Sequence, residues 1–226
     1  MNDSLPDRLA AFARELHDEQ EVTETAQTML RHASRLTDCP QASITLYNAP
    51  SSIDTTCATA PQAHKATLAQ VDLGEGPNVT ALSSDEPVVA DDIPADTRWR
   101  RWAPIVAELG FNGVVSIRLG TQSTTLGTLS LYSTFAKRFD DGHVTTLNLY
   151  AQHASAAVVA AQRRSKLRHA IDSRNLIGQA QGILLERHAL DAEGAYAMLQ
   201  RYARDNRVNL VKGAGDIVAG RRHTVN

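Results

Sequence analysis

Residues 141–189 contain no proline, and glycine occurs among them only at positions 142, 178 and 182. Proline ends helices because it lacks an amide donor and clashes with the preceding turn. The composition of this stretch therefore predicts one helix of more than forty residues, which is long for a helix inside a compact domain. We expect two parts of the chain, residues 1–160 and 161–226, to share this helix.

The residues before the long helix alternate between strand and helix patterns. In "ASITLYN", residues 42–48, Ile44 and Leu46 point to one side and Ser43 and Thr45 to the other, as in a half-buried strand. The pattern predicts helices over 5–16, 22–37, 62–72 and 96–110, and a helical turn at "NVTALSS". It predicts strands over 42–48, about 55–60, 112–120 and 125–134, and a short buried strand within 86–93 that leads into an acidic loop. This order indicates an α+β domain with an antiparallel sheet.

The residues after the long helix predict two shorter helices. The first covers residues 191–206 and has Asp191 as a natural N-cap, and the second lies within residues 208–222. Their short apolar faces can be buried only against each other and against the end of the long helix. The expected fold class is thus α+β, with an N-terminal antiparallel sheet domain with flanking helices, a long connecting helix and a C-terminal all-α three-helix domain.

Two glycines inside the long helix need an explanation, because each costs about 1 kcal/mol relative to alanine in a helix interior. Gly178 and Gly182 lie four residues apart, with Ala180 between them. Small side chains at these positions would allow the backbones of neighbouring helices to approach closely.

The middle of the long helix, residues 163–174, has few apolar side chains, namely Leu167, Ala170 and Ile171. A lone helix with so thin an apolar stripe is marginally stable in water. Pairing with a second copy would bury the stripe, as in a short coiled coil. The sequence therefore predicts a homodimer whose connecting helices run side by side.

Charge is distributed unevenly along the chain. From residue 163 onward there are twelve Lys and Arg against six Asp and Glu, whereas residues 1–162 hold eleven basic and nineteen acidic residues. The acidic first part is not expected to bind a polyanion, but the basic second part is suited to it.

Several function classes are not supported. No run of eighteen apolar residues and no secretory signal pattern is present, so we expect a cytoplasmic protein without a membrane span. Cys39 and Cys57 fit no metal or redox motif, and the eight histidines show no ligand spacing. We read the acidic loop residues Asp91, Asp92 and Asp96 as solvated or capping groups. The sequence predicts no cofactor, no metal site and no enzyme.

The C-terminal part resembles a known family. "SRNLIGQAQGILLERHALDAEGAYAMLQRYARDN" is similar to the ANTAR domain, and the resemblance extends over about residues 165–220. The matching positions are Arg174, Ile177, Gly178, Ala180, Gly182, Ile183, Leu184, Arg187, Ala195, Leu199, Leu210 and Ala214. "LGEGPNVTAL", "DTRWRRWAP" and "LGTLSLYS" resemble a GAF sensor domain over about residues 20–160, as found fused to ANTAR in actinobacterial proteins.

This resemblance implies transcription antitermination. The ANTAR part would bind nascent RNA that carries paired hairpins, and the GAF part would sense a signal, of unknown chemistry, that controls it. The residues expected at the RNA are Arg174, Gln179, Ala180, Gln181, Gly182, Arg187, Arg201, Arg204 and Arg207. The residues expected around a small ligand in the GAF part are Tyr47, Asn78, Trp99, Trp102, Ser116 and Tyr132.

Some expected cations are missing. Gln181 and Val211 stand where the ANTAR family commonly has lysine and arginine, although Arg204, Arg207 and Lys212 could compensate. RNA affinity depends on how many phosphates are neutralised. A second hypothesis is therefore a dimeric sensor or scaffold whose C-terminal helices bind a protein partner. The small residues at 178–182 could serve close approach of either RNA or another helix, and the arginines could also form an ordinary solvated helix face.

Overall fold

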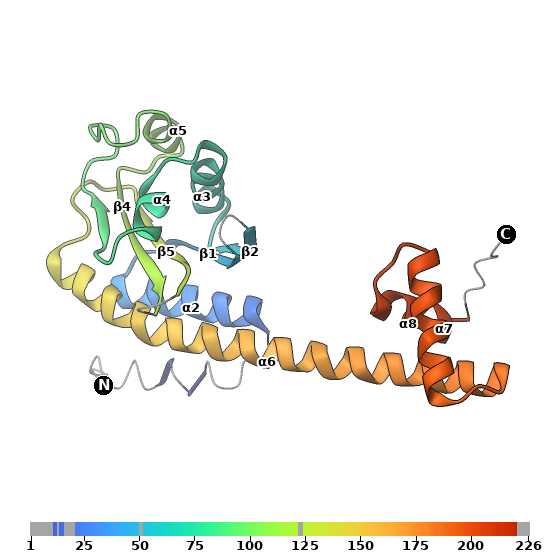
Figure 1. Ribbon diagram of the computed structural model, residues 1–226. Coiled ribbons are helices and arrows are strands. Elements are labelled where there is room, and N and C mark those ends of the chain that lie inside the picture. Colours follow the sequence, from blue (N-terminus) through green and yellow to red (C-terminus); the bar gives the residue numbers. More distant parts are fainter. Residues whose placement is uncertain (1–10, 13, 16–20, 50–51, 122–123, 221–226) are drawn as a thin grey trace. The chain divides into compact units, whose positions relative to one another are not determined.

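The computed structural model describes residues 11–12, 14–15, 21–49, 52–121 and 124–220. The chain divides into two compact units, residues 1–163 and 164–226. One helix, α6 (Asp141–His188), contributes its first part to the first unit and its second part to the second (Figure 1). This observation confirms the long helix that the proline-free stretch predicts.

A five-stranded antiparallel sheet forms the centre of the first unit, in the order β2-β1-β5-β4-β3. The strands are β1 (Gln41–Ala49), β2 (Ser52–Ala58), β3 (Val88–Ala90), β4 (Gly113–Gly120) and β5 (Thr125–Ser133). The two long neighbours β1 and β5 are far apart in the sequence, and they pair from Gln41 opposite Tyr132 to Leu46 opposite Gly127. The antiparallel sheet predicted from the alternation is confirmed.

One face of this sheet is apolar and packs on two helices, α2 (Val22–Thr37) and the first part of α6 (Figure 1). Strand alternation places Ile44, Leu129 and Ile117 on this face, where they are at most 2% exposed. Tyr150 of α6 donates a hydrogen bond of 2.8 Å from its hydroxyl to the Met29 carbonyl of α2. This bond joins the two helices that cover the face.

The opposite face is covered by α3 (Pro61–Leu73), α4 (Pro77–Leu82) and α5 (Trp102–Glu108) (Figure 1). A second apolar cluster lies here around Trp102, Phe111 and Val114. Helix α5 ends at Glu108, and Gly110, two residues later, has a φ of 88° in the left-handed region. The amides of Gly110 and Phe111 bond back to the carbonyls of Ala107 and Val106, which is a Schellman C-cap.

One prediction of element length was wrong in this region. The predicted helix over 96–110 is helical only from Trp102 to Glu108. The short strand predicted within 86–93, followed by an acidic loop, is confirmed as Val88–Ala90. The helix begins late because the Glu75 carboxylate accepts from the backbone amides of Arg101 and Trp102, at 2.7 and 3.3 Å. A side chain 26 residues away therefore sets this helix start, which local periodicity does not reveal.

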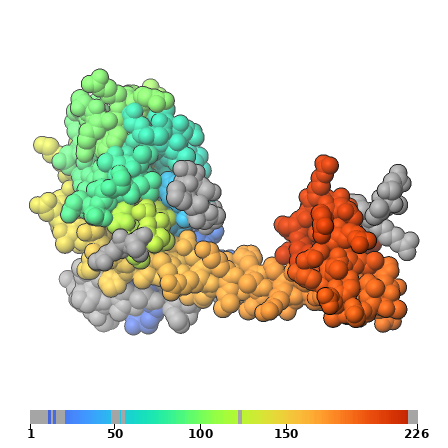
Figure 2. All heavy atoms as spheres, in the orientation of Figure 1, coloured from blue at the N-terminus to red at the C-terminus, as the bar shows by residue number. Residues whose placement is uncertain are grey.

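The second unit consists of the second part of α6 with α7 (Ala192–Asp205) and α8 (Leu210–Val218). Its core contains Ala180, Leu184, Ala195, Leu199, Ala214 and Ile217. In Figure 2 the atoms of α7 and α8 form one continuous body. The predicted N-cap Asp191 accepts from the Gly194 amide at 2.8 Å, and Asn209 caps α8 in the same way.

The remaining predicted helices and strands are confirmed within the residues that the structure describes. Helices over 22–37, 62–72, 191–206 and 208–222 correspond to α2, α3, α7 and α8. The predicted helix over 5–16 lies mostly outside the described residues, although residues 11–12 and 14–15 are helical. No helix in the described part of the chain has the length and apolarity that a membrane span requires.

We predict that Gly127→Ala destabilises the first unit strongly. A Cβ at this position of β5 would overlap the Thr45 carbonyl of β1, and backbone at the centre of a sheet cannot move aside. The expected loss is about 2–4 kcal/mol in the free energy of unfolding, measured by chemical denaturation. Gly142→Ala is the matched control, because its Cβ would meet only the Asp140 side chain at 3.3 Å. Equal stability of the two variants would contradict the prediction.

Candidate functional site

The sheet face beneath α3 and α4 carries rows of hydroxyl side chains. In register, Ser43 of β1 pairs with Ser130 of β5, which pairs with Ser116 of β4. Two residues further along these strands, on the same face, Thr45 pairs with Thr128. All five residues are at most 1% exposed. Buried polar groups need hydrogen-bond partners, so this face is either internally satisfied or built to meet another polar group.

The serine row is internally satisfied. Ser116 donates to the Asn78 side-chain oxygen at 2.9 Å, and Ser130 donates to the same oxygen. The two serine hydroxyls are also within 2.8 Å of each other. Asn78 lies in the first turn of α4, so these bonds fix that helix on the sheet.

Tyr132 extends this network to α3. Its hydroxyl accepts from the Gln70 amide at 2.9 Å and lies 3.0 Å from the Thr67 hydroxyl. The Gln70 side-chain oxygen in turn accepts a hydrogen bond from the backbone amide of Asn78 at 2.6 Å. Complete burial raises the pKa of Tyr132 to about 12, so the phenol stays protonated at neutral pH.

The threonine row is different. The hydroxyls of Thr45 and Thr128, together with that of Thr56 opposite Thr45 on β2, have no hydrogen-bond partner among the described atoms. An unsatisfied buried hydroxyl costs about 1–3 kcal/mol. Thr45 and Thr128 were not among the predicted ligand contacts, although the alternation in "SITLY" and "TLSLY" places them on one face with Ser43 and Tyr132.

Two tryptophans close the outer side of this region. The Trp99 indole donates to the Thr80 hydroxyl of α4 at 3.1 Å, and the Trp102 indole donates to the Ala66 carbonyl of α3 at 2.9 Å. Their rings meet edge to face, with centroids 5.8 Å apart. Both side chains are at most 4% exposed, so they belong to the core of this cover.

The structure thus brings together five of the six residues predicted around a small ligand. Asn78, Ser116 and Tyr132 belong to one hydrogen-bonded network, while Trp99 and Trp102 lie in the cover above it. The sixth, Tyr47, is half-buried on β1, two residues beyond Thr45. Because the network residues bond to each other, the free hydroxyls of the threonine row are the additional candidates for ligand contact.

In the second unit, the small residues at 178–182 divide between two sides of α6. Ala180 is fully buried in the three-helix core, so its predicted contact with RNA is wrong for this conformation. Gly178 and Gly182 are exposed, and an added Cβ at either would meet no atom within 4 Å. The prediction that these glycines let helices of the same chain approach closely is therefore also wrong.

The predicted RNA-contacting arginines are all exposed. They are Arg174 and Arg187 on α6, Arg201 and Arg204 on α7, and Arg207 just after α7. None of them forms an ion pair with a carboxylate in the described part of the chain. Gln179 is exposed, and Gln181 donates to the Ala192 carbonyl at 3.4 Å. These guanidinium groups are available to bind phosphate.

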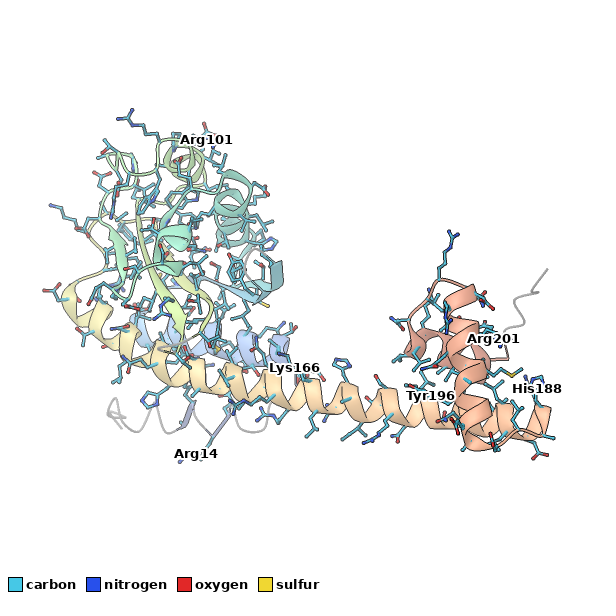
Figure 3. The ribbon with its side chains drawn as sticks, in the orientation of Figure 1. Arg14, Arg101, Lys166, His188, Tyr196 and Arg201 are labelled. Atoms are coloured by element: carbon cyan, nitrogen blue, oxygen red, sulfur yellow. The ribbon has the colours of Figure 1, made fainter. Side chains whose placement is uncertain are left out.

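One accessible aromatic ring was missed by the sequence analysis. Tyr196 on α7 is 38% exposed, and both Tyr196 and Arg201 project from this helix in Figure 3. Tyr202 instead packs on the three-helix core, with its hydroxyl buried. The distinguishing signal was present, because Tyr196 directly follows the core residue Ala195 and so leaves the apolar stripe.

Comparison with protein families matches both units. A GAF domain model matches residues 19–159, and an ANTAR domain model matches residues 165–218. The chain belongs to the GAF domain family and carries a C-terminal ANTAR domain. The GAF match covers more than half of the chain, and the two matches together account for the sheet unit and the three-helix unit.

Solved structures support the fold of the GAF domain. The GAF domain of an Acinetobacter phosphoenolpyruvate-protein phosphotransferase is 13% identical, covers 74% of this chain and 99% of its own, and has a TM-score of 0.56. The corresponding domain from Coxiella burnetii is 15% identical with the same coverage and a TM-score of 0.57.

A free methionine-R-sulfoxide reductase from Neisseria meningitidis is also similar, at 15% identity, 70% and 90% coverage and a TM-score of 0.51. A search of curated proteins finds no match.

The two domains define the class of protein. An ANTAR domain marks an RNA-binding transcription antitermination regulator, and a GAF domain marks a sensor in signal transduction. Both are regulatory domains. The exposed arginines therefore belong to the RNA-binding part of the chain, and the hydroxyl-lined sheet face belongs to the sensor part.

We predict opposite effects for two threonine-to-valine substitutions in the GAF domain. Thr45→Val removes a hydroxyl without a partner and should leave stability unchanged or raise it by about 1 kcal/mol. Thr67→Val removes contacts to Ser43 and Tyr132, at 2.6 and 3.0 Å, and should lower stability by about 1–3 kcal/mol. Thermal and urea melts would compare the two variants, and a loss at Thr45 as large as that at Thr67 would contradict the prediction.

Two alanine substitutions test the surroundings of glycines in the ANTAR domain. Gly178→Ala should raise helix stability by up to about 1 kcal/mol, because its Cβ meets open space. Gly213→Ala should lower stability, because its Cβ would lie 3.2 Å from the Ala203 Cβ in a packed core. Hydrogen exchange of the α7 amides would report both changes. Destabilisation by Gly178→Ala would contradict the prediction and show that the glycine has a packing role.

Proposed function

We propose that this protein binds nascent RNA carrying paired hairpins through its ANTAR domain and thereby keeps a terminator from forming. The observation that carries the proposal is the set of exposed arginines without ion pairs in a domain of the ANTAR family. Arg201 and Arg204 lie three residues apart on α7, so they share one side of that helix. Phosphate binding by guanidinium groups would supply affinity, and the Tyr196 ring offers a surface on which a loop base could stack.

The GAF domain is proposed to receive a small-molecule signal that controls the ANTAR domain. The proposed site is the sheet face beneath α3 and α4. The buried side chains of that face are neutral and carry hydroxyl and amide groups, so they favour an uncharged ligand over an anion. We place sensing in residues 1–160 and RNA binding in residues 161–226, in a cytoplasmic protein that acts as a homodimer and catalyses no reaction.

RNA crosslinking tests this function. We predict that the wild type recovers transcripts with paired hairpins and that Arg201→Glu/Arg204→Glu loses them, with affinity lower by about tenfold or more. The dependence of binding on salt should also weaken, by about 1.5 in the slope of log K against log salt concentration, because two phosphate contacts are lost.

The matched control for this experiment is Lys65→Glu/Arg100→Glu. It reverses two exposed charges in the GAF domain and changes the net charge equally. Retained binding by the control together with loss by the ANTAR variant would support the proposed interface. Equal recovery of RNA by the wild type and the ANTAR variant would show that these arginines do not form it. Recovery of no RNA, with a protein captured instead, would favour the scaffold hypothesis.

A further inference from the structure

The threonine row of the GAF sheet ends in a charged residue. Arg118 of β4 pairs with Thr128 of β5. Thr128 pairs in turn with Thr45 of β1, and Thr45 pairs with Thr56 of β2. Cross-strand partners lie on the same face of a sheet, so Arg118 shares this face with the three threonines whose hydroxyls have no hydrogen-bond partner among the described atoms. We call these four residues the Arg118 row.

The position of Arg118 follows from the shortness of β3. Val88 opposite Ser116 is the last pair between β3 and β4, so β4 forms the edge of the sheet at Arg118, two residues further along. The residues just before β3 reach this edge, because the Asp85 carboxylate accepts a hydrogen bond from the Arg118 guanidinium at 2.7 Å. The side chain of Arg118 is 20% exposed and that of Asp85 is 91% exposed. The Arg118 row therefore ends in an ion pair that a small solute can reach.

The bond to Asp85 is the exchangeable one of those that Arg118 makes. Its Nη1 atom donates to the Thr121 carbonyl and to the Thr125 hydroxyl, both at 3.3 Å, and these two acceptors belong to the β4–β5 hairpin. The third acceptor, Asp85, is a largely solvated side chain. Exposed ion pairs contribute little to stability, so replacement of Asp85 by another carboxylate costs little.

The ion pair selects the charges of a ligand. A carboxylate that binds the Arg118 guanidinium lies next to the Asp85 carboxylate, and the two like charges repel each other. A lone cation at Asp85 meets Arg118 in the same way. A small zwitterion satisfies both groups, with its carboxylate on Arg118 and its ammonium on Asp85. Such a ligand has no net charge, which agrees with the neutral buried side chains of this face.

The spacing of the strands selects the length of the ligand. Neighbouring strands are about 4.8 Å apart, so Thr128 and Thr45 follow Arg118 at about 5 and 10 Å along the row. The side chain of glutamine reaches about 5 Å from its Cα to its amide group, by ordinary bond lengths. An amide offers donors and an acceptor to hydroxyls that lack partners.

The threonine hydroxyls are closed to solvent in the structure, since Thr45 and Thr128 are at most 1% exposed. Residues 83–87 connect β3 to α4, which lies over β4 and β5 (Figure 1). When a ligand takes over the charges of Arg118 and Asp85, this connection loses the bond that joins it to β4. We therefore expect ligand binding to move residues 83–87 and to give the buried hydroxyls the partners that they lack.

We propose that the Arg118 row binds a free α-amino acid with an uncharged polar side chain. The α-carboxylate binds Arg118, the α-ammonium binds Asp85, and the polar end of the side chain bonds to Thr128 and Thr45. This proposal rests on the sensing role proposed for the GAF domain and names the chemical class of its signal. It does not depend on RNA binding by the ANTAR domain.

The test is calorimetric titration of the full chain with glutamine and four analogues. N-acetylglutamine lacks the ammonium charge, glutamine α-amide lacks the carboxylate, and N-acetylglutamine amide lacks both. Norleucine keeps both charges and has an apolar side chain of similar length. Each analogue should bind at least about tenfold more weakly than glutamine, because each loses hydrogen bonds to a charged or a buried group.

Three variants assign the roles of the residues. Asp85→Asn should bind glutamine about tenfold more weakly but N-acetylglutamine more tightly than the wild type does, since the repelling carboxylate is gone. Arg118→Gln should lose both of these ligands. Thr128→Val should bind glutamine and norleucine with nearly equal affinity, and its thermal melt should match that of the wild type. A merely structural role of Asp85 would not exchange the preference between two ligands.

Arg31→Gln is the matched control. It breaks an ion pair of 2.8 Å between Arg31 of α2 and Glu15, on the other side of the sheet, and should bind all five compounds as the wild type does. Hydrogen exchange adds a structural measurement. Glutamine should increase exchange of the amides in residues 83–87 of the wild type but not in Arg118→Gln.

The outcomes separate this proposal from the proposed function. If none of the five compounds binds, or if Asp85→Asn keeps the ligand preference of the wild type, the assignment to an amino acid is overturned. N-acetylglutamine amide binding as tightly as glutamine would retain the sensor face but overturn the zwitterion. An unchanged preference of Thr128→Val for glutamine over norleucine would overturn the part played by the threonines. Selective glutamine binding by a protein that recovers no RNA would support this site and contradict the proposed RNA function.

Discussion

The structure depends on the uninterrupted hydrogen-bond ladder of α6. Within the GAF domain this helix buries Leu147, Tyr150, Ala154 and Val158 against the apolar face of the sheet. Within the ANTAR domain it buries Ala180 and Leu184 against two short helices. A domain of three short helices has little apolar area of its own, so α6 supplies the longest element of that core. Neither domain is complete without its part of this helix.

The GAF sheet shows how one set of strands can serve two purposes. At the centre of β1, β4 and β5, alternation sends leucine and isoleucine to one face and serine, threonine and tyrosine to the other. The apolar face joins the sheet to α2 and α6, and its burial dominates stability. The hydroxyl face holds α3 and α4 through directional bonds, which fix their position but leave the threonine row unsatisfied.

Much of this architecture could be predicted from the sequence, because local patterns determine it. The positions of proline and glycine predicted the extent of α6, and the alternation of apolar and polar residues predicted the strands over 112–120 and 125–134. The start of α5 could not be predicted, since it depends on the Glu75 carboxylate. The surroundings of Gly178 and Gly182 were predicted wrongly although the signal was present. The apolar positions Ala180, Ile183 and Leu184 mark the core side of α6, and at 100° per residue both glycines lie on the other side.

The tryptophans of this chain have a further consequence. The sequence contains two, Trp99 and Trp102, and both lie in the cover above the hydroxyl face, where they meet edge to face. The ANTAR domain has none. Tryptophan fluorescence, which is excited selectively at the red edge of protein absorption, therefore arises from one small region of the GAF domain. The protein carries its own optical probe of that cover, and spectra could follow events there without any attached dye.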